Sequence, residues 1–296
     1  GHLVHMPSHI FFRIGRYNDA AQANLRAAEV DEAYIAACNA QGFYPALYYP
    51  HNIHFLWSAS TMQGQSALSI ESARRVVENV RVEQVKAFPT IEFFRTVPLL
   101  SLVRFAKWDD ILTEPQPNEE FMFARSVWHY SRGVAFAAKG QPEDAKAELA
   151  MLEPLKDDVS VLFLDSRDYP GSALVGIAIH LLEGEIAYRG SEFDQAVSHF
   201  EQAVAAQDLL PYTEPPFWYY PTRQSLGAAL AAGGKHAEAE AVFRKDLKQY
   251  PHNGWSMFGL AQSLTAQGKI EEAAKAKMHF EIIWQFADVE LTESIL

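Results

Sequence analysis

The chain has 296 residues, a formal net charge of −12 and 49% hydrophobic residues. Such an acidic chain lacks the clustered Lys and Arg footprint that a phosphate backbone requires, which argues against a nucleic-acid partner. It contains no run of about 18 apolar residues, so the sequence predicts no membrane span. The hydrophobic content predicts a large buried core and excludes a disordered chain.

The chain opens with a histidine-rich segment that leads into a turn. Residues 1–10 read GHLVHMPSHI, and GRYNDA follows at residues 15–20. Pro7 either begins a helix or kinks one, because proline has no backbone N–H to donate. Gly15 and Ala20 are five residues apart, as expected for a tight turn and the close helix that follows it. We therefore expect a hairpin of two antiparallel helices here.

The same pattern returns along the chain. The clearest cases are the turns at Gly234 and Gly268, which are 34 residues apart and are followed by Ala239 and Ala273. Further predicted turns lie at Gly64, at Ala106-Lys107-Trp108 without a glycine, at Gly140 and at Gly190-Ser191. Spacings that depart from this period predict extra loops, near residues 36–47, 79–90, 153–172 and 208–219.

A small residue at the helix crossing, a turn glycine and a later alanine, with a 34-residue spacing between the last two turns, resemble the tetratricopeptide (TPR) repeat. The resemblance implies an all-α fold, a right-handed superhelical solenoid of about seven helix–turn–helix repeats. We expect residues 1–296 to form a single solenoid, with His-rich repeats over 1–78 and further repeats over 91–296. The first helix of each repeat then lines a concave groove where a partner binds.

Five histidines fall at groove-facing positions of the first two repeats. In the TPR pattern these positions lie thirteen, ten and six residues before the turn glycine. Counting back from Gly15 and Gly64 therefore selects a set of five residues: His2, His5, His9, His51 and His54.

Their spacing predicts a shared metal site. His5 and His9 are four residues apart and His51 and His54 three apart, so each pair shares a helix face. Packed helix axes lie about 8–10 Å apart, close enough for imidazoles of both helices to meet one ion. Neutral imidazole suits Zn, Cu, Fe or Ni. We expect these four histidines to be ligands, with His2 as an optional fifth.

Other interpretations of the histidines stay open. They can line the groove without a common ligand, grip an anionic ligand, or serve in acid–base chemistry. At the level of function, the alternatives to a metal-binding scaffold are a metal-dependent enzyme using the same cluster and a metal-free interaction scaffold. The sequence has no Gly-rich phosphate loop, no nucleophile elbow and no HExxH motif, so we expect no nucleotide cofactor.

The rest of the predicted groove is less polar and suits a peptide, a protein or an apolar small molecule. The residues at similar offsets are Phe93, Tyr130, Gln224, Trp255 and Phe258. The stretch EPPFWYYP at residues 214–221 is interpreted either as an aromatic lid over this groove or as a loop held by its own aromatic rings.

A second resemblance concerns the first 78 residues most closely. GHLVHMPSHI, GRYNDA, the segment DEAY at 31–34, and YYPHNIHF followed by Trp57 and an MQG turn resemble a group of bacterial TPR-containing proteins. The resemblance implies that this chain is the C-terminal part of a longer solenoid whose upstream TPR half is missing here. It implies no particular reaction. Any targeting signal would lie upstream, so the compartment, cytoplasmic or periplasmic, stays open.

Overall fold

The computed structural model describes residues 1–40 and 44–295, and the regular elements of these residues are all helical. A π-helical turn covers Tyr44–Tyr48, and 3-10 turns cover Pro89–Thr96 and Glu153–Asp157. The α-helices are α1 (His2–His5), α2 (Pro7–Arg13), α3 (Tyr17–Cys38), α4 (Tyr49–Gln63), α5 (Ser66–Glu78), α6 (Val82–Ala87), α7 (Val97–Arg104), α8 (Trp108–Thr113), α9 (Met122–Ala138), α10 (Pro142–Leu152), α11 (Val159–Asp165), α12 (Gly171–Arg189), α13 (Phe193–Asp208), α14 (Arg223–Ala232), α15 (His236–Gln249), α16 (Gly254–Ala266) and α17 (Ile270–Ile283).

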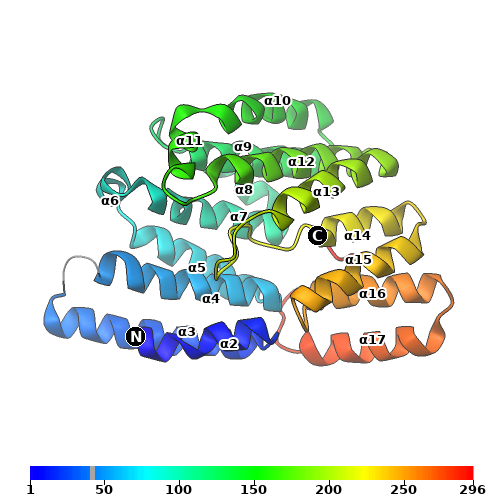
Figure 1. Ribbon diagram of the computed structural model, residues 1–296, viewed down its shortest axis with the longest axis horizontal. Helices are drawn as coiled ribbons and strands as arrows, with labels where there is room; N and C mark the ends of the chain where they lie inside the picture. The colour runs from blue at the N-terminus through cyan, green and yellow to red at the C-terminus, as the bar shows by residue number, and fades with distance from the viewer. Residues whose placement is uncertain (41–43, 296) are drawn as a thin grey trace.

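Consecutive helices pack as hairpins, and the predicted turns are confirmed. The pairs are α2–α3, α4–α5, α7–α8, α9–α10, α12–α13, α14–α15 and α16–α17 (Figure 1). Each turn contains one residue with positive φ, the left-handed conformation that ends many helices. Five of these residues are glycines, at positions 15, 64, 140, 234 and 268, whereas in the fifth hairpin turn Ser191, rather than Gly190, takes the positive φ. Ala106 does so in the turn that lacks a glycine.

The small residues of the repeat allow the helices to approach closely. A Cβ atom added to Gly227 of α14 would lie 2.4 Å from the Phe243 ring of α15. One added to Gly259 of α16 would lie 2.3 Å from the same ring. Phe243 therefore sits in a space left by two missing side chains, and larger residues at either glycine would push the helices apart.

The row of hairpins curls round until its last repeat lies beside its first two (Figure 1). The indole Nε1 of Trp255 in α16 donates to the backbone oxygen of Thr61 in α4 at 3.2 Å. The Asp288 carboxylate accepts the backbone N–H groups of Ser66 and Ala67 at 2.6 and 2.9 Å. It thereby caps the N-terminus of α5 from the other end of the chain.

Two non-helical segments cross the interior of this curl. One is the crossing segment, residues 209–222, and the other is the 284–295 segment. Ser294, near the end of the second segment, donates its hydroxyl to the backbone oxygen of Gln224 in α14. Both segments cover the inner surface that the sequence predicted to be an open groove.

The predicted groove residues are accordingly covered to different degrees. Tyr130 is 2% exposed, and Gln224 and Trp255 are 0% exposed. Phe258 is half-buried against Phe280, and Phe93 is half-buried between other rings. The repeat offsets placed these residues on the inner surface, but other parts of the same chain now lie over much of it.

The predicted loops contain more helix than we expected. Residues 79–90 include α6, and residues 153–172 include a 3-10 turn and α11. Helix α3 continues to Cys38, into the predicted loop 36–47, of which residues 41–43 lie outside the described part. Residues 209–219 form no helix, because Pro211, Pro215 and Pro216 cannot sit in a helix interior. The separation into His-rich and further repeats stays a prediction.

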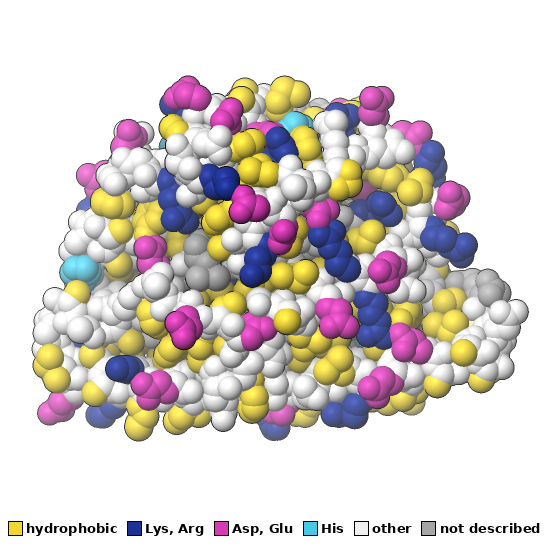
Figure 2. All heavy atoms as spheres, turned by 180° about the vertical axis from the view of Figure 1, so that it is seen from behind, with side chains coloured by type: hydrophobic (Ala, Val, Ile, Leu, Met, Phe, Trp, Pro, Cys, Tyr) yellow, Lys and Arg dark blue, Asp and Glu magenta, His cyan; other side chains and the backbone are white. Residues whose placement is uncertain are grey.

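The surface and the helices agree with the charge and hydropathy of the sequence. On the face seen in Figure 2, Lys and Arg side chains are interspersed with Asp and Glu and do not form a continuous basic surface among the described residues. None of the described helices is both long and apolar enough to cross a membrane.

Candidate metal centre

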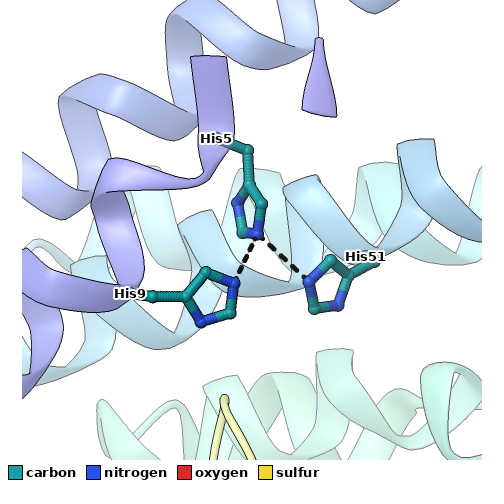
Figure 3. Close-up of side chains that lie close together, drawn as sticks. All are labelled: His5, His9 and His51. Carbon is teal, nitrogen blue, oxygen red and sulfur yellow. Dashed lines mark hydrogen bonds between the residues drawn. The ribbon is translucent and has the colours of Figure 1, made fainter. Parts of the chain in front are cut away.

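Three histidines from two neighbouring repeats meet at one point on the inside of the curl (Figure 3). His5 ends the short helix α1 and Pro7 begins α2, with Met6 between them in a helical backbone conformation. His9 lies in the first turns of α2, and His51 follows Pro50 in the first turn of α4. The two prolines thus set where the helices begin and bring the three rings together.

The Nε2 atoms of these rings face one another. His5 Nε2 lies 2.9 Å from His9 Nε2 and 3.2 Å from His51 Nε2. Figure 3 shows His5 pointing into the space between the other two rings, each on its own helix. His5 is fully buried, whereas His9 and His51 are half-buried. We call these three residues the His5 cluster.

The outer nitrogens of two of these rings are held by hydrogen bonds. His5 Nδ1 lies 2.7 Å from Asn24 Oδ1. The amide of Asn24 is oriented, because its Nδ2 donates to the backbone oxygen of Ala20 at 2.8 Å. His5 Nδ1 must therefore carry the proton and donate it to Asn24. His9 Nδ1 likewise lies 2.6 Å from Glu214 Oε2, which can only accept when ionised.

These outer bonds decide where the lone pairs point. With a proton fixed on each Nδ1, neutral His5 and His9 both direct an Nε2 lone pair into the 2.9 Å space between the rings. Two lone pairs at that distance repel each other unless a cation, either a proton or a metal ion, lies between them. A positive charge between the two rings would relieve this repulsion.

Burial keeps the rings neutral. Desolvation lowers the pKa of His5 to about 4, and the adjacent His9 lowers it further, while the bond to Asn24 opposes this. Desolvation and the neighbouring rings of His5 and His9 lower the pKa of His51 to about 3. At neutral pH both rings therefore present the unprotonated nitrogen that a transition metal binds.

The other two predicted ligands lie apart from this point. His54 stacks on Trp57 with 5.0 Å between ring centroids and meets the edge of Phe93 at 5.3 Å. His2 packs against Tyr48, and its ring lies 5.6 Å from that of His5. His51 and His54 share a face of α4, but His51 turns towards α1 and α2 while His54 turns towards the aromatic rings that follow α6.

A cavity of about 250 Å³ separates α4 from the crossing segment. His51, His54 and Glu214 belong to its wall, so a molecule in the cavity lies next to the His5 cluster. The remaining wall is mostly aromatic and aliphatic, formed by Trp57, Phe93, Thr96, Val97, Leu100, Phe123, Val127, Tyr169, Leu174, Thr213, Pro215, Pro216, Phe217 and Trp218. A space of this size and character suits a compact, largely apolar group.

The sequence did not identify Asn24 or Glu214 as part of the site. Asn24 lies on α3 and faces His5 from the second helix of the hairpin, where the groove offsets do not apply. Glu214 is 205 residues from His9 in the chain, in the crossing segment. The only available signal was the proline-rich stretch around Glu214, which we interpreted as either a lid or a pinned loop.

A second group of possible ligands lies on α12 and α13. Glu183 Oε2 is 3.1 Å from His180 Nδ1 and 3.0 Å from His199 Nδ1. All three side chains are partly exposed, with 25–30% of their surface accessible. We call this the His180 cluster.

Comparison with known proteins agrees with the helical hairpins. The model of a tetratricopeptide repeat family matches residues 225–278, which run from α14 into α17. The chain therefore contains TPR repeats, and its fold is an all-helical solenoid. TPR solenoids are characteristically scaffolds for partner binding. None of the curated proteins compared with the chain matches it.

Proposed function

We propose that the chain is a partner-binding TPR scaffold that holds one transition-metal ion on His5, His9 and His51. The observation that supports this is that three imidazole rings converge, with the outer nitrogens of His5 and His9 held by hydrogen bonds to Asn24 and Glu214. Zinc, copper(II), nickel and iron all accept imidazole nitrogen. His2 and His54 are left out of the ligand set because their rings pack elsewhere.

The distances within the His5 cluster fit such an ion. Nitrogens bound to zinc at about 2.0–2.1 Å in a tetrahedron lie about 3.3 Å from one another. The Nε2 atoms of His9 and His51 lie 2.9 and 3.2 Å from that of His5. All three ligand atoms lie within 4.8 Å of one another, so the rings would have to move closer for the three nitrogens to reach one ion.

The hydrogen bonds behind the rings also suit a metal centre. A ligating histidine commonly donates its other N–H to a carboxylate or carbonyl oxygen, which fixes the ring and makes it a better ligand. Glu214 does this for His9 and Asn24 does it for His5. Glu214 adds a negative charge that partly balances the ion.

Three protein ligands leave a coordination position for a bound molecule. The neighbouring cavity of about 250 Å³ offers the space for a peptide side chain or a small molecule with an apolar body. In this proposal the ion binds one donor atom of the partner, and the aromatic wall packs against the rest.

The open position also favours a second candidate, a metal-dependent enzyme that uses the same cluster, because catalytic zinc sites keep three protein ligands and one exchangeable position. The carboxylate nearest the cluster, Glu214, is engaged by His9 and Tyr212. Because Glu214 is already engaged, a binding role is favoured over a role as a general base.

A cobalt-substituted protein whose visible spectrum changes on addition of azide would demonstrate an exchangeable position. Both candidate functions require such a position, so only turnover of a substrate would favour the enzyme.

Elemental analysis and isothermal titration with Zn²⁺ and Co²⁺ test the metal centre. We expect about one ion per wild-type chain and none in the double variant His5→Ala/His51→Ala. The matched control is His180→Ala/His199→Ala, which removes two histidines of the other cluster and should keep the ion. Circular dichroism establishes that each variant retains its helices.

Two results would contradict the proposal. One is wild-type protein, purified without chelator, that contains no transition metal and takes up none on titration. The other is a folded double variant that binds the ion as well as wild type does. Partner binding that persists after chelation would then support the metal-free scaffold.

A further inference from the structure

The 284–295 segment lies on the inner surface of the later repeats as a non-helical chain with bends at residues 288–289 and 292–294. It is anchored at its start, where the Trp284 indole donates to the backbone oxygen of Val289 at 2.9 Å and Asp288 caps α5. Beyond Val289 it makes no helix among its described residues. From there it passes successively across α16, α12 and α14.

The contacts beyond Val289 are those of a bound peptide. Gln262 of α16 donates its amide to the backbone oxygen of Thr292 at 2.8 Å. The Tyr188 hydroxyl of α12 donates to the Glu293 carboxylate. The Ser294 hydroxyl donates to a backbone oxygen of α14 at 3.1 Å. Each contact involves one group of the segment, as in the recognition of a bound peptide by a groove.

The last described residue of the segment is its apolar anchor. Ile295 is 8% exposed and lies among Arg104, Tyr130 and Phe200, next to a small cavity. The Arg104 guanidinium stacks 3.6 Å from the centroid of the Trp255 ring, so this end of the groove is rigid and lined by rings. The segment thus presents a carboxylate, a hydroxyl and an aliphatic side chain in consecutive positions.

The segment fills its groove incompletely. A cavity of about 290 Å³ remains beside Glu293 and Ser294, lined mainly by small or apolar residues of α14, α15 and α16, among them Ala228, Phe243 and Gly259. Thr292 and Glu293 are exposed in spite of their hydrogen bonds. Ser294 and Ile295 are buried, so residues 292–293 are the part of the contact region that opens at the lowest free-energy cost.

We propose that this groove is the binding site for a non-helical peptide segment of a partner protein, and that residues 290–295 occupy it as an exchangeable internal substitute. The partner segment carries an acidic side chain, then a hydroxyl, then an aliphatic side chain, and has a bulkier apolar group that fills the remaining cavity. This inference rests on the proposed role as a partner-binding scaffold, but it does not depend on the metal ion.

A partner peptide has to displace the tethered segment, so the strength of the internal contacts determines how tightly the partner binds. A short flexible connection holds a binding segment at an effective concentration of the order of millimolar. A free peptide of the same sequence therefore binds weakly to the wild-type chain. Weakening the internal contacts should release the groove and strengthen binding of the free peptide.

The test uses the full-length chain and a fluorescent peptide of residues 287–296. The variant Glu293→Ala/Ser294→Ala/Ile295→Ala weakens the internal segment and leaves the groove itself unchanged. The matched control is Glu290→Ala, which removes an exposed carboxylate of the same segment. Fluorescence anisotropy should show the peptide binding at least about tenfold more tightly to the triple variant than to wild type or control.

A peptide that carries the same three alanines should not bind, and hydrogen exchange of residues 290–295 should be faster than that of α14 and α16. The proposal is overturned if the folded triple variant binds the peptide no better than wild type, or binds the alanine peptide equally well. It is also overturned if the triple variant loses its helical circular dichroism, because the segment is then an integral part of the fold. None of these results bears on the metal, which is measured separately.

Discussion

The His5 and His180 clusters contain similar residues but arrange their hydrogen bonds in opposite directions. In the His5 cluster the Nδ1 atoms of His5 and His9 donate outwards to Asn24 and Glu214, and the inner nitrogens have lone pairs. In the His180 cluster both Nδ1 atoms face one oxygen of Glu183. His180 Nδ1 is hydrogen-bonded to that oxygen, whereas His199 Nδ1 lies 3.0 Å from it without forming a hydrogen bond.

The difference shows that proximity alone does not define a metal site. Three potential ligand atoms lie close together in both clusters. The His5 cluster combines burial, lowered pKa values at His5 and His51, and separate hydrogen-bond partners behind His5 and His9. The predictions below test this contrast from the largest expected effect to the smallest.

Removal of one ring from each cluster should give the largest contrast. We expect His9→Ala to weaken zinc binding by more than about 100-fold, because a ligand is lost together with its bond to Glu214. His199→Ala should leave zinc affinity unchanged. Isothermal titration of both folded variants measures the effect, and equal losses in the two would remove the distinction between the clusters.

Neutralisation of the carboxylate in each cluster should have an intermediate effect. Glu214→Gln keeps the size of the side chain but removes the charge behind His9, and mutation of such a partner typically costs about 10–100-fold in metal affinity. Glu183→Gln should have no effect on that affinity. If Glu214→Gln binds zinc as tightly as wild type, Glu214 has no role in the site.

Acidification should have the smallest effect on metal affinity. Because burial lowers the pKa of His5 to about 4 and that of His51 to about 3, protons compete poorly at these rings above that range. We expect zinc affinity to fall by less than about tenfold between pH 7 and pH 5.5, measured by competition with a chromophoric chelator. A steep loss over this range would mean that the rings titrate like exposed histidines.

The same pKa shifts have a defined sign for the stability of the metal-free chain. A histidine with a depressed pKa in the folded state stays neutral, whereas in the unfolded chain it takes up a proton below its ordinary pKa of 6.5. Stability is therefore lost as pH falls from about 6.5 towards 4. Urea unfolding at a series of pH values should show a smaller loss in His5→Gln than in wild type.

The repeat pattern predicted most of the fold because the residues that define it determine the local backbone conformation and the local approach of two helices. A positive φ at a turn and a missing side chain at a crossing can each be recognised from a single residue, as at Gly234 and Gly227. What fills the interior could not be predicted in this way. The sequences around Trp218 and Ile295 have no repeat pattern. Their positions depend on surfaces that are formed by repeats far apart in the chain.

The same limit applies to the candidate site. Helical spacing selected His5, His9 and His51, because residues three or four apart share a face. It also selected His54, but the ring of His54 stacks on Trp57. The spacing of the histidines gives no information about that contact. Glu214 acts across 205 residues of chain, so only the assembled structure places it behind His9.

The bond between Asp288 and the start of α5 has a consequence for how the molecule unfolds. In an open array of repeats each unit contacts only its neighbours, and the terminal units can melt independently. Here the N-terminal end of α5 depends on a carboxylate supplied after the last hairpin. Melting of that hairpin therefore also uncaps an early one, which couples the two ends and favours loss of structure in a single cooperative step.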